Sequence, residues 1–353
     1  MLKKAIVIFL IIFGLVALWV STSTTTMEYL HYYRRGDAWW NSNNCKHGNL
    51  VGMAYLDFVA QYNTTWEATH KSYSKRNGDE KAVLYLFGDS YSWPLRDSDF
   101  ANIAAYHFTN RYQGGRYRLD TSKTNILVIE VAERMLLEYF SSVKMKDEFT
   151  TNKEGKEVMG AKNNNLEVLS SRHGSFTGIG SLFNPRINQN LEYNLFNYNF
   201  LSIMFKVKAT FNYYLFNRAS GDVVISEDRN YLFDKGSVSL NSSSGAYTPI
   251  AMQTINEVVK NLNFLYNYYR KAGFNEVYFS IIPSTPSIVQ PSGYNQLIPR
   301  IQNNPYLRVK ILDIYNELNQ PGEDYFCHGD THWNYKGEQK WLELVNKQLM
   351  KVR

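Results

Sequence analysis

The 353-residue sequence has few cysteines, no basic run and no internal repeat, and these absences narrow the classes of protein to which it can belong. Its Lys and Arg residues are scattered, with no run of five or more and no nucleic-acid-binding module, so we expect no nucleic-acid partner. The two cysteines, Cys45 and Cys327, allow one disulfide at most, and two separate thiols are the alternative. With 44% hydrophobic residues the chain can bury a full core.

An uncharged segment, residues 5–20, follows Lys3 and Lys4 at the start of the chain. As a helix it would be about 24 Å long, slightly shorter than a bilayer core of roughly 30 Å. Residues 17–20 offer no A-x-A cleavage site, which favours an uncleaved signal anchor within residues 1–25 over a cleaved signal peptide. We therefore expect a single-pass protein of the inner (cytoplasmic) membrane whose remaining chain lies on the periplasmic or extracellular side.

Apolar runs typical of strands alternate with helical patterns along much of the sequence. Strands are predicted at 82–87, 125–131, 277–282 and 309–312, and helices at 133–143, 255–269 and 336–350. This alternation predicts an α/β fold with three layers, α/β/α, around a mostly parallel sheet. Ligands of such sheets bind at the carboxyl ends of the strands.

The domain organisation follows from where this alternation starts and where it is interrupted. Residues 81–350 are predicted to form the main α/β domain, and residues 26–80 an N-terminal extension that packs on it. Residues 144–250 break the alternation and are predicted to form an inserted cap region. Within the insertion, a long aromatic helix is expected at 195–216 and a short hairpin at 222–233.

Ser90 follows the first buried strand in a Gly88-Asp89-Ser90 turn, so its hydroxyl should project from the carboxyl edge of the sheet. A nucleophilic serine needs this placement, together with a base that takes its proton and N–H groups that hold the oxyanion. The tripeptide alone is a weak signal, because a serine beside an aspartate is also typical of a helix cap or a turn.

Asp330 and His332 lie just before the last predicted helix. A carboxylate two residues from an imidazole could orient it as it accepts the serine proton. The alternatives are a surface ion pair, or a transition-metal site in which His328 and Cys327 join these two residues. No further cluster of His, Asp or Glu completes such a metal site, so no metal or other cofactor is expected.

The two blocks together resemble the SGNH (GDSL-type) hydrolase superfamily. The nearer resemblance is to its acetyltransferase-like branch, which includes the alginate O-acetyltransferases of the AlgX and AlgJ type and the proteins named for a DHHW motif. Residues 88–92 (GDSYS) and 330–334 (DTHWN) carry it, and residues 128–134 and 278–299 support it. The resemblance implies that Ser90 is the nucleophile, His332 the general base and Asp330 its orienting carboxylate.

Three positions depart from the pattern of the superfamily. Gly329 stands where most members have the aspartate, and Glu130 to Arg134 occupy the strand end where ordinary members have a G-x-N-D block. Thr285 stands where the acetyltransferase-like branch often has a lysine. The source of the oxyanion-binding groups is therefore left open by the sequence.

The candidates for the oxyanion hole and the substrate pocket come from several segments. The backbone N–H groups of Ser90 and Tyr91, a Gly114-Gly115 amide and the Arg134 side chain are the candidate donors, although the two glycines also fit a plain turn and Arg134 a structural ion pair. Tyr91, Trp93 and Trp333 would wall a pocket at this site or else pack in the core.

The resemblance implies an O-acyltransferase, most simply an O-acetyltransferase, that acts on a cell-envelope or secreted polysaccharide through an acyl-enzyme. The acyl donor would be supplied across the membrane by a multipass acyltransferase. A carbohydrate O-acetyl esterase of the same fold is the first alternative, because it differs only in the acceptor. A non-catalytic glycan-binding or assembly protein on the same scaffold is the second.

Overall fold

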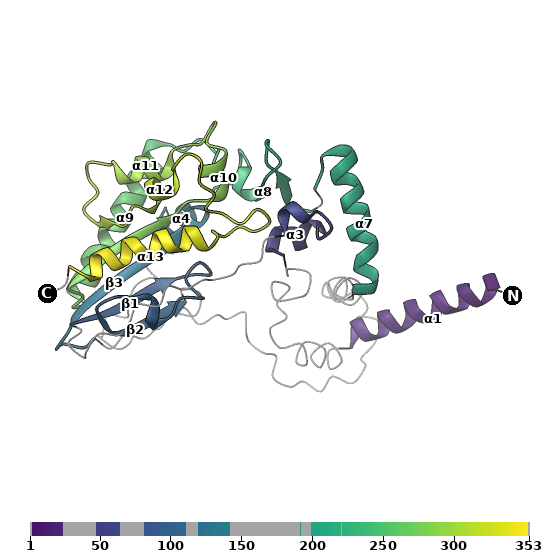
Figure 1. Cartoon of the computed structure of the whole chain (residues 1–353), viewed down its shortest axis with the longest axis horizontal. Coiled ribbons are helices and arrows are strands. Elements are labelled where there is room, and N and C mark those ends of the chain that lie inside the picture. Colours follow the sequence, from purple (N-terminus) through teal and green to yellow (C-terminus); the bar gives the residue numbers. More distant parts are fainter. Residues whose placement is uncertain are drawn as a thin grey trace. The chain divides into compact units, whose positions relative to one another are not determined.

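The computed structural model describes residues 2–23, 47–63, 81–110, 119–141, 191, 199–219 and 221–351 (Figure 1). The chain divides into two compact units. Unit 1 contains Met1–Thr65 and Val168–Ile225, and unit 2 contains Trp66–Glu167 and Ser226–Arg353. Gly114, Gly115, Cys45 and about half of the inserted region lie outside the described residues, so the predictions that depend on them stay predictions.

Unit 2 is built on a parallel five-stranded sheet of order β2-β1-β3-β6-β7. Its strands are β1 (Ala82–Gly88), β2 (Ile103–Asn110), β3 (Thr124–Ala132), β6 (Glu276–Ile282) and β7 (Lys310–Ile311). The inner strand β1 is buried along its whole length, because both of its faces are covered. The prediction of an α/β fold with a mostly parallel sheet is confirmed, and the SGNH arrangement stays a prediction.

One face of this sheet is covered by α4 (Glu133–Phe140), α9 (Met252–Lys271) and α11 (Leu297–Gln302), whose apolar side chains form the main core with it. The buried stripe of α9 recurs at helical spacing through Ile255, Val258, Leu262 and Leu265. Gly273, at φ 108°, follows the end of this helix in a conformation that favours glycine.

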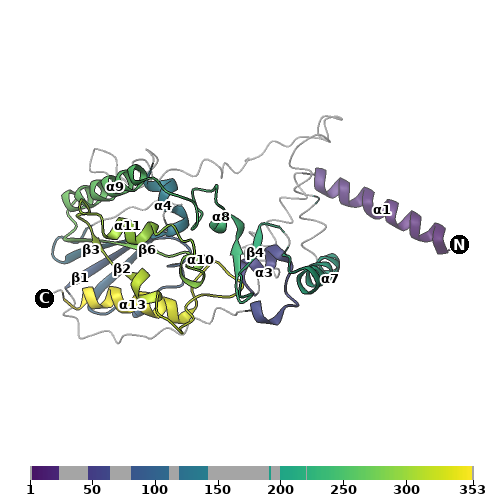
Figure 2. The same ribbon diagram turned by 90° about the horizontal axis from the view of Figure 1, so that it is seen from above.

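The other face is covered by α13 (Tyr335–Leu349), and Figure 2 shows the sheet between α9 and α13. Trp341 Nε1 donates a hydrogen bond to Ser280 Oγ of β6 at 2.9 Å. Asn346 accepts from the Ala101 N–H and donates to the Asp99 carbonyl, which fixes the helix against the segment after η4 (Asp97–Asp99). The shorter helices of this unit are α8 (Lys235–Val238), α10 (Thr285–Val289) and α12 (Ile314–Leu318).

Unit 1 contains α1 (Leu2–Thr22), α3 (Asn49–Ala54), η3 (Ala60–Tyr62), α7 (Asn199–Phe216) and β4 (Val223–Ile225). Within it, the η3 segment of the predicted N-terminal extension contacts the aromatic helix of the predicted insertion, because Gln61 Nε2 donates to Tyr213 Oη at 2.7 Å. Residues Lys3–Thr22 of α1 have a mean hydropathy of 2.7 and are long enough to cross a membrane, as a signal sequence would also be.

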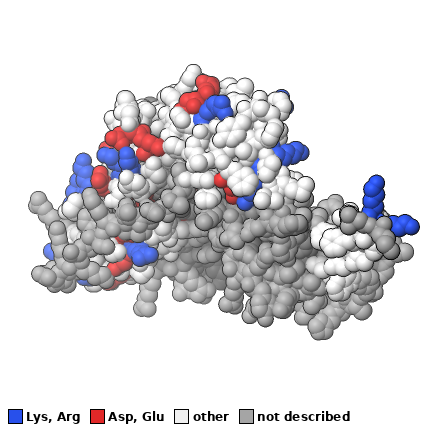
Figure 3. All heavy atoms as spheres, turned by 45° about the vertical axis from the view of Figure 1, so that its right-hand side comes forward, with Lys and Arg blue, Asp and Glu red and all other residues white. Residues whose placement is uncertain are grey.

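Several element bounds differ from the sequence-based expectation. Strand β2 was not predicted, because it lies at the sheet edge and most of its side chains are partly or fully exposed. The expected strand at 309–312 is reduced to Lys310–Ile311. The expected hairpin contains β4 and β5 (Leu232–Asp234), and a hydrogen bond from the Ser226 N–H to the Tyr231 carbonyl closes the turn between them. On the face drawn in Figure 3, the acidic side chains lie next to basic ones.

Candidate active site

The turn after β1 holds Ser90 at the carboxyl edge of the sheet. The Ser92 N–H donates to the Asp89 carbonyl at 3.1 Å and closes the turn. Glu130, fully buried on the neighbouring strand β3, accepts hydrogen bonds from the Asp89 N–H and from Ser92 Oγ, each at 3.0 Å. A Cβ at Gly88 would lie 2.8 Å from Glu130 Oε2, so the glycine permits this close approach. The buried carboxylate therefore fixes the turn on both sides of the serine.

Ser90, His332 and Asp330 form a continuous hydrogen-bonded chain. Ser90 Oγ lies 2.7 Å from His332 Nε2, although the two residues are 242 positions apart in the sequence. His332 Nδ1 lies 2.5 Å from Asp330 Oδ1, and the side chains of the pair are 13% and 18% exposed. An imidazole placed in this way can take the serine proton through Nε2 while the carboxylate fixes its tautomer. The structure thus brings together the three residues that the sequence singles out.

The histidine and the aspartate lie on one tight loop between Phe326 and Trp333, which pair as an antiparallel bridge. The Cys327 N–H donates to the His332 carbonyl at 3.0 Å inside this loop. Asp330 Oδ1 also accepts from the His332 N–H at 3.0 Å, so a single carboxylate oxygen holds both the backbone and the ring of the histidine. The two-residue spacing is what makes this double contact possible.

The rest of the second motif anchors this loop to α13. Asn334 is the N-cap of the helix, and its Oδ1 accepts from the N–H groups of Lys336 and Gly337 at 2.9 and 3.3 Å. A Cβ at Gly337 would lie 2.6 Å from the Tyr325 carbonyl oxygen and 2.7 Å from Trp333 Cβ. The Asn and the Gly therefore serve the packing of the loop against the helix.

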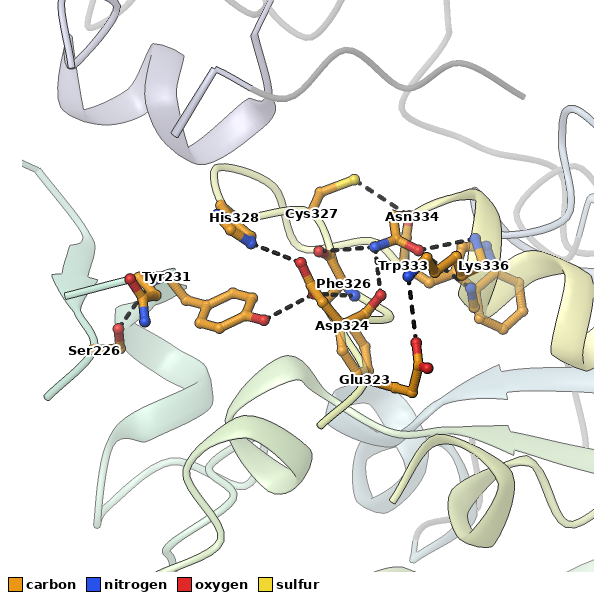
Figure 4. A network of polar contacts seen from close by, with 12 residues as sticks. Ser226, Tyr231, Glu323, Asp324, Phe326, Cys327, His328, Trp333, Asn334 and Lys336 are labelled. Atoms are coloured by element: carbon orange, nitrogen blue, oxygen red, sulfur yellow. Dashed lines mark hydrogen bonds and ion pairs between the residues drawn. The ribbon is translucent and has the colours of Figure 1, made fainter. Parts of the chain in front are cut away.

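A network of polar contacts supports the far side of the loop (Figure 4). Asp324 accepts from Tyr231 Oη and lies against His328 Nε2, each at 2.8 Å. Burial alone would raise the pKa of Asp324, but the hydrogen bonds from His328 and Tyr231 outweigh it and lower the pKa below its ordinary value. The His328 carbonyl accepts from the Leu232 N–H at 2.8 Å, which ties the loop to β5.

The contacts of His328 and Cys327 can be compared with the alternative in which these two residues join Asp330 and His332 in a metal site. His328 faces Asp324, whereas His332 faces Ser90, so the two imidazoles have different partners. Among the residues that the structure describes, no group of three His, Cys, Asp or Glu side chains could hold a metal ion. Cys327 Sγ lies 3.4 Å from the Trp333 carbonyl, inside the loop.

Tyr91 and Trp333, expected either to wall a pocket or to pack in the core, are buried behind the imidazole. They are 1% and 0% exposed, and the Tyr91 ring lies 4.6 Å from the His332 ring and 5.1 Å from the Trp333 ring. Burial raises the pKa of the Tyr91 phenol, which donates to the Thr331 carbonyl at 2.6 Å. The Arg134 guanidinium carbon lies 5.9 Å from the centre of the Tyr91 ring. The buried Tyr91 and Trp333 rings therefore pack beside the histidine.

The backbone amides near the serine differ in their availability as oxyanion donors. The Tyr91 N–H donates to Asp89 Oδ1 at 3.1 Å and is therefore occupied. The Ser90 N–H has no hydrogen-bond partner in the part of the chain that the structure describes. Of the two backbone candidates, the geometry favours the amide of Ser90 itself.

A second buried carboxylate, Glu133, stands at the start of α4, next to the candidate Arg134. It accepts from the Ser284 N–H at 2.8 Å and from Ser287 Oγ and Tyr294 Oη, each at 2.6 Å. Burial raises its pKa even though these hydrogen bonds act in the opposite direction. The signal in the sequence is a pair of glutamates, Glu130 and Glu133, at the end of an apolar strand. Each fixes a loop that follows a strand of the sheet.

Comparison of the chain with family models, curated proteins and solved structures finds no match. The site is therefore interpreted from its own geometry.

Proposed function

We propose that the chain is a membrane-anchored serine O-acyltransferase of the SGNH type, most simply an O-acetyltransferase, which modifies a cell-envelope or secreted polysaccharide. The observation that carries the proposal is the chain of contacts from Ser90 through His332 to Asp330, at 2.7 and 2.5 Å. The candidate membrane helix α1 supports a location at the inner membrane, with the catalytic unit on the periplasmic or extracellular side.

In the proposed reaction, Ser90 Oγ attacks the acyl carbonyl carbon while its proton passes to His332 Nε2. The tetrahedral oxyanion is held by the Ser90 N–H, and the imidazolium is stabilised by Asp330. Collapse breaks the bond to the leaving group, which takes the proton from the imidazolium, and an acyl-serine remains. A sugar hydroxyl then gives its proton to the imidazole and attacks the acyl-serine carbonyl carbon. Collapse breaks the bond to Ser90 Oγ, which takes the proton back from the imidazolium, and the acylated sugar leaves as the ester.

The same residues would serve an esterase, in which water replaces the sugar hydroxyl as acceptor. Transfer is favoured by the sequence resemblance and by the candidate anchor, which suits an acyl donor delivered by a multipass membrane acyltransferase. The non-catalytic alternative does not explain the short contact between Ser90 Oγ and His332 Nε2.

Trapping the acyl-enzyme tests the proposal. The full chain in detergent is incubated with p-nitrophenyl acetate, quenched in acid and digested. The mass of the peptide that contains Ser90 is then measured by mass spectrometry. We expect one acetyl group on this peptide, none in Ser90→Ala, and a strongly reduced amount in Asp330→Asn, because asparagine fixes the wrong tautomer of the imidazole. Ser122→Ala, a change in an exposed turn, is the matched control and should acylate normally. Equal acylation of the wild type and Ser90→Ala would remove the nucleophile assignment.

Transfer and hydrolysis separate in a second assay. Release of nitrophenol is compared with acetate formation in the presence of polysaccharides of different composition. A transferase forms less acetate than nitrophenol when its acceptor is present, because the acetyl group ends on the sugar. Equal amounts with every acceptor would favour the esterase alternative.

A further inference from the structure

Helix α7 of unit 1 packs inward through a polar stripe. Lys206 Nζ lies 3.1 Å from Asp57 Oδ1, and both side chains are largely buried, at 14% and 10% exposure. Two turns further along the same side, Tyr213 Oη accepts a hydrogen bond from Gln61 Nε2, and its ring packs edge-on against Tyr62 at 5.7 Å. Ala209, between them, is 3% exposed. The side of the helix that faces the protein therefore carries its ion pair and its hydrogen bonds.

The opposite side of α7 is apolar and exposed. Met204, Val207, Phe211 and Leu215 are spaced three or four residues apart, so they lie on one face of the helix, and their exposure ranges from 53% to 69%. Ile203 and Tyr214 widen this apolar face and are each half exposed or more. A helix on the surface of a water-soluble protein has the reverse arrangement, with its apolar stripe inward and its polar residues outward. An exposed patch of this kind marks an interaction surface.

Two further features indicate which surface covers this face. No acidic residue occurs in α7, and Lys208 is exposed beside the apolar face, which suits an anionic surface. The candidate membrane helix α1 belongs to the same unit and is joined to α3 by residues 23–48, so a bilayer would be within reach of this unit. Interfacial helices combine large apolar side chains on one face with lysine at its border.

We propose that α7 is an interfacial membrane helix, with the face made by Met204, Val207, Phe211 and Leu215 embedded at the headgroup boundary of an anionic phospholipid bilayer. The helix lies in the plane of the membrane and does not cross it, because Lys206 and its partner Asp57 occupy the side opposite to the lipid. Unit 1 is then attached to the bilayer at two places, α1 and α7. The proposal does not depend on the acyltransferase function, because none of these residues belongs to the candidate active site.

Spin-label accessibility tests this directly in the full chain. Single cysteines are introduced as Phe211→Cys or Leu215→Cys in a Cys45→Ser background, and the chain is reconstituted at low density in vesicles of phosphatidylcholine and phosphatidylglycerol. Cys327 is buried and should take up little label, which the parent without an added cysteine measures. Tyr306→Cys, at an exposed position of unit 2, is the aqueous control.

We expect the labels on α7 to collide often with oxygen, which concentrates in lipid, and rarely with a water-soluble nickel complex, with the reverse at position 306. Frequent collision with nickel at 211 and 215 would overturn the proposal. Low collision with both reagents would also overturn it, because the face would then be buried against protein. Dipolar coupling between labels on different chains would assign the face to a second copy and equally overturn the lipid assignment.

A charge variant supplies a second measurement. Val207→Glu places a carboxylate in the middle of the embedded face but leaves the Lys206 ion pair intact. With the label at Leu215→Cys, we expect several-fold more nickel collisions than without the added charge. Val207→Leu should leave the collisions unchanged. The same accessibility in both variants would show that this face does not contact lipid.

Discussion

Asn334 caps α13 and also braces the loop that carries His332, so we predict that Asn334→Ala lowers both the stability of unit 2 and the reactivity of Ser90. Its Oδ1 accepts from two N–H groups in the first turn of α13, at 2.9 and 3.3 Å. Its Nδ2 donates to the carbonyls of Asp324 and Phe326, at 3.0 and 3.4 Å. The alanine variant loses all four contacts at once.

The magnitude follows from what each contact contributes. Loss of an N-cap side chain costs about 1 kcal/mol. The two bonds from the amide nitrogen add about 1 kcal/mol more, because the side chain is only partly buried and water replaces part of them. A total of about 2 kcal/mol corresponds to a fall in Tm of roughly 4–8 °C for a unit of this size. A shift of the loop by about 1 Å would slow acylation of Ser90 by up to about 100-fold.

Asp313→Ala is the matched control, because Asp313 caps α12 in the same unit through the Asn316 N–H at 3.1 Å but does not contact the loop. Thermal unfolding and the rate at which a fluorophosphonate labels Ser90 are measured for both variants. We expect similar losses of stability, with slower labelling only in Asn334→Ala. Equal labelling rates in the two variants would refute the bracing role, whatever their stabilities.

Three further predictions concern the stability of unit 2. The pKa of Glu338 is raised to about 7 by burial and by the nearby Asp99 carboxylate, so the folded state holds this proton more tightly than the unfolded state. The stability that this proton provides is complete below the ordinary pKa of 4.5 and is lost as the pH rises through 7, by on the order of 3 kcal/mol. Denaturant titrations at several pH values should show this loss in the wild type but not in Glu338→Gln. Glu130→Ala leaves two buried donors unpaired and should cost about 2–6 kcal/mol in the same titrations, whereas Glu130→Gln should cost clearly less; similar values would contradict this account of the turn. Gly337→Ala, which forces a Cβ against the Trp333 side chain, should lower the free energy of unfolding by about 1–3 kcal/mol, and an unchanged value would show that the contact relaxes freely.

The sequence predicts the interior of the sheet better than its edges. Strands β1, β3 and β6 are buried on both faces, so their sequences are nearly continuous apolar runs that can be recognised locally. The edge strand β2 escapes such recognition, since its side chains are mostly exposed and its place depends on pairing with β1. The helices α9 and α13 follow from periodicity and lie within three residues of their expected bounds.

Within the candidate site, what is local in sequence could be predicted and what depends on distant packing could not. Asp330 and His332 are two residues apart and Ser90 stands at the end of a strand, so these three residues can be picked out from the local sequence. The burial of Tyr91 and Trp333 behind the imidazole depends on the loop docking against α13, which no local pattern shows. The hydrogen bonds of Glu133 likewise depend on segments about 150 positions later in the sequence.

Ser90 and His332 are 242 positions apart, so the two residues are synthesised at different times. The polypeptide leaves the ribosome from its amino end, so Ser90 emerges long before the loop that contains His332 has been made. Until that loop docks, the hydroxyl has no proton acceptor and stays as unreactive as that of an ordinary serine. In the proposed reaction, the topology alone would therefore keep a nascent or truncated chain from premature acylation.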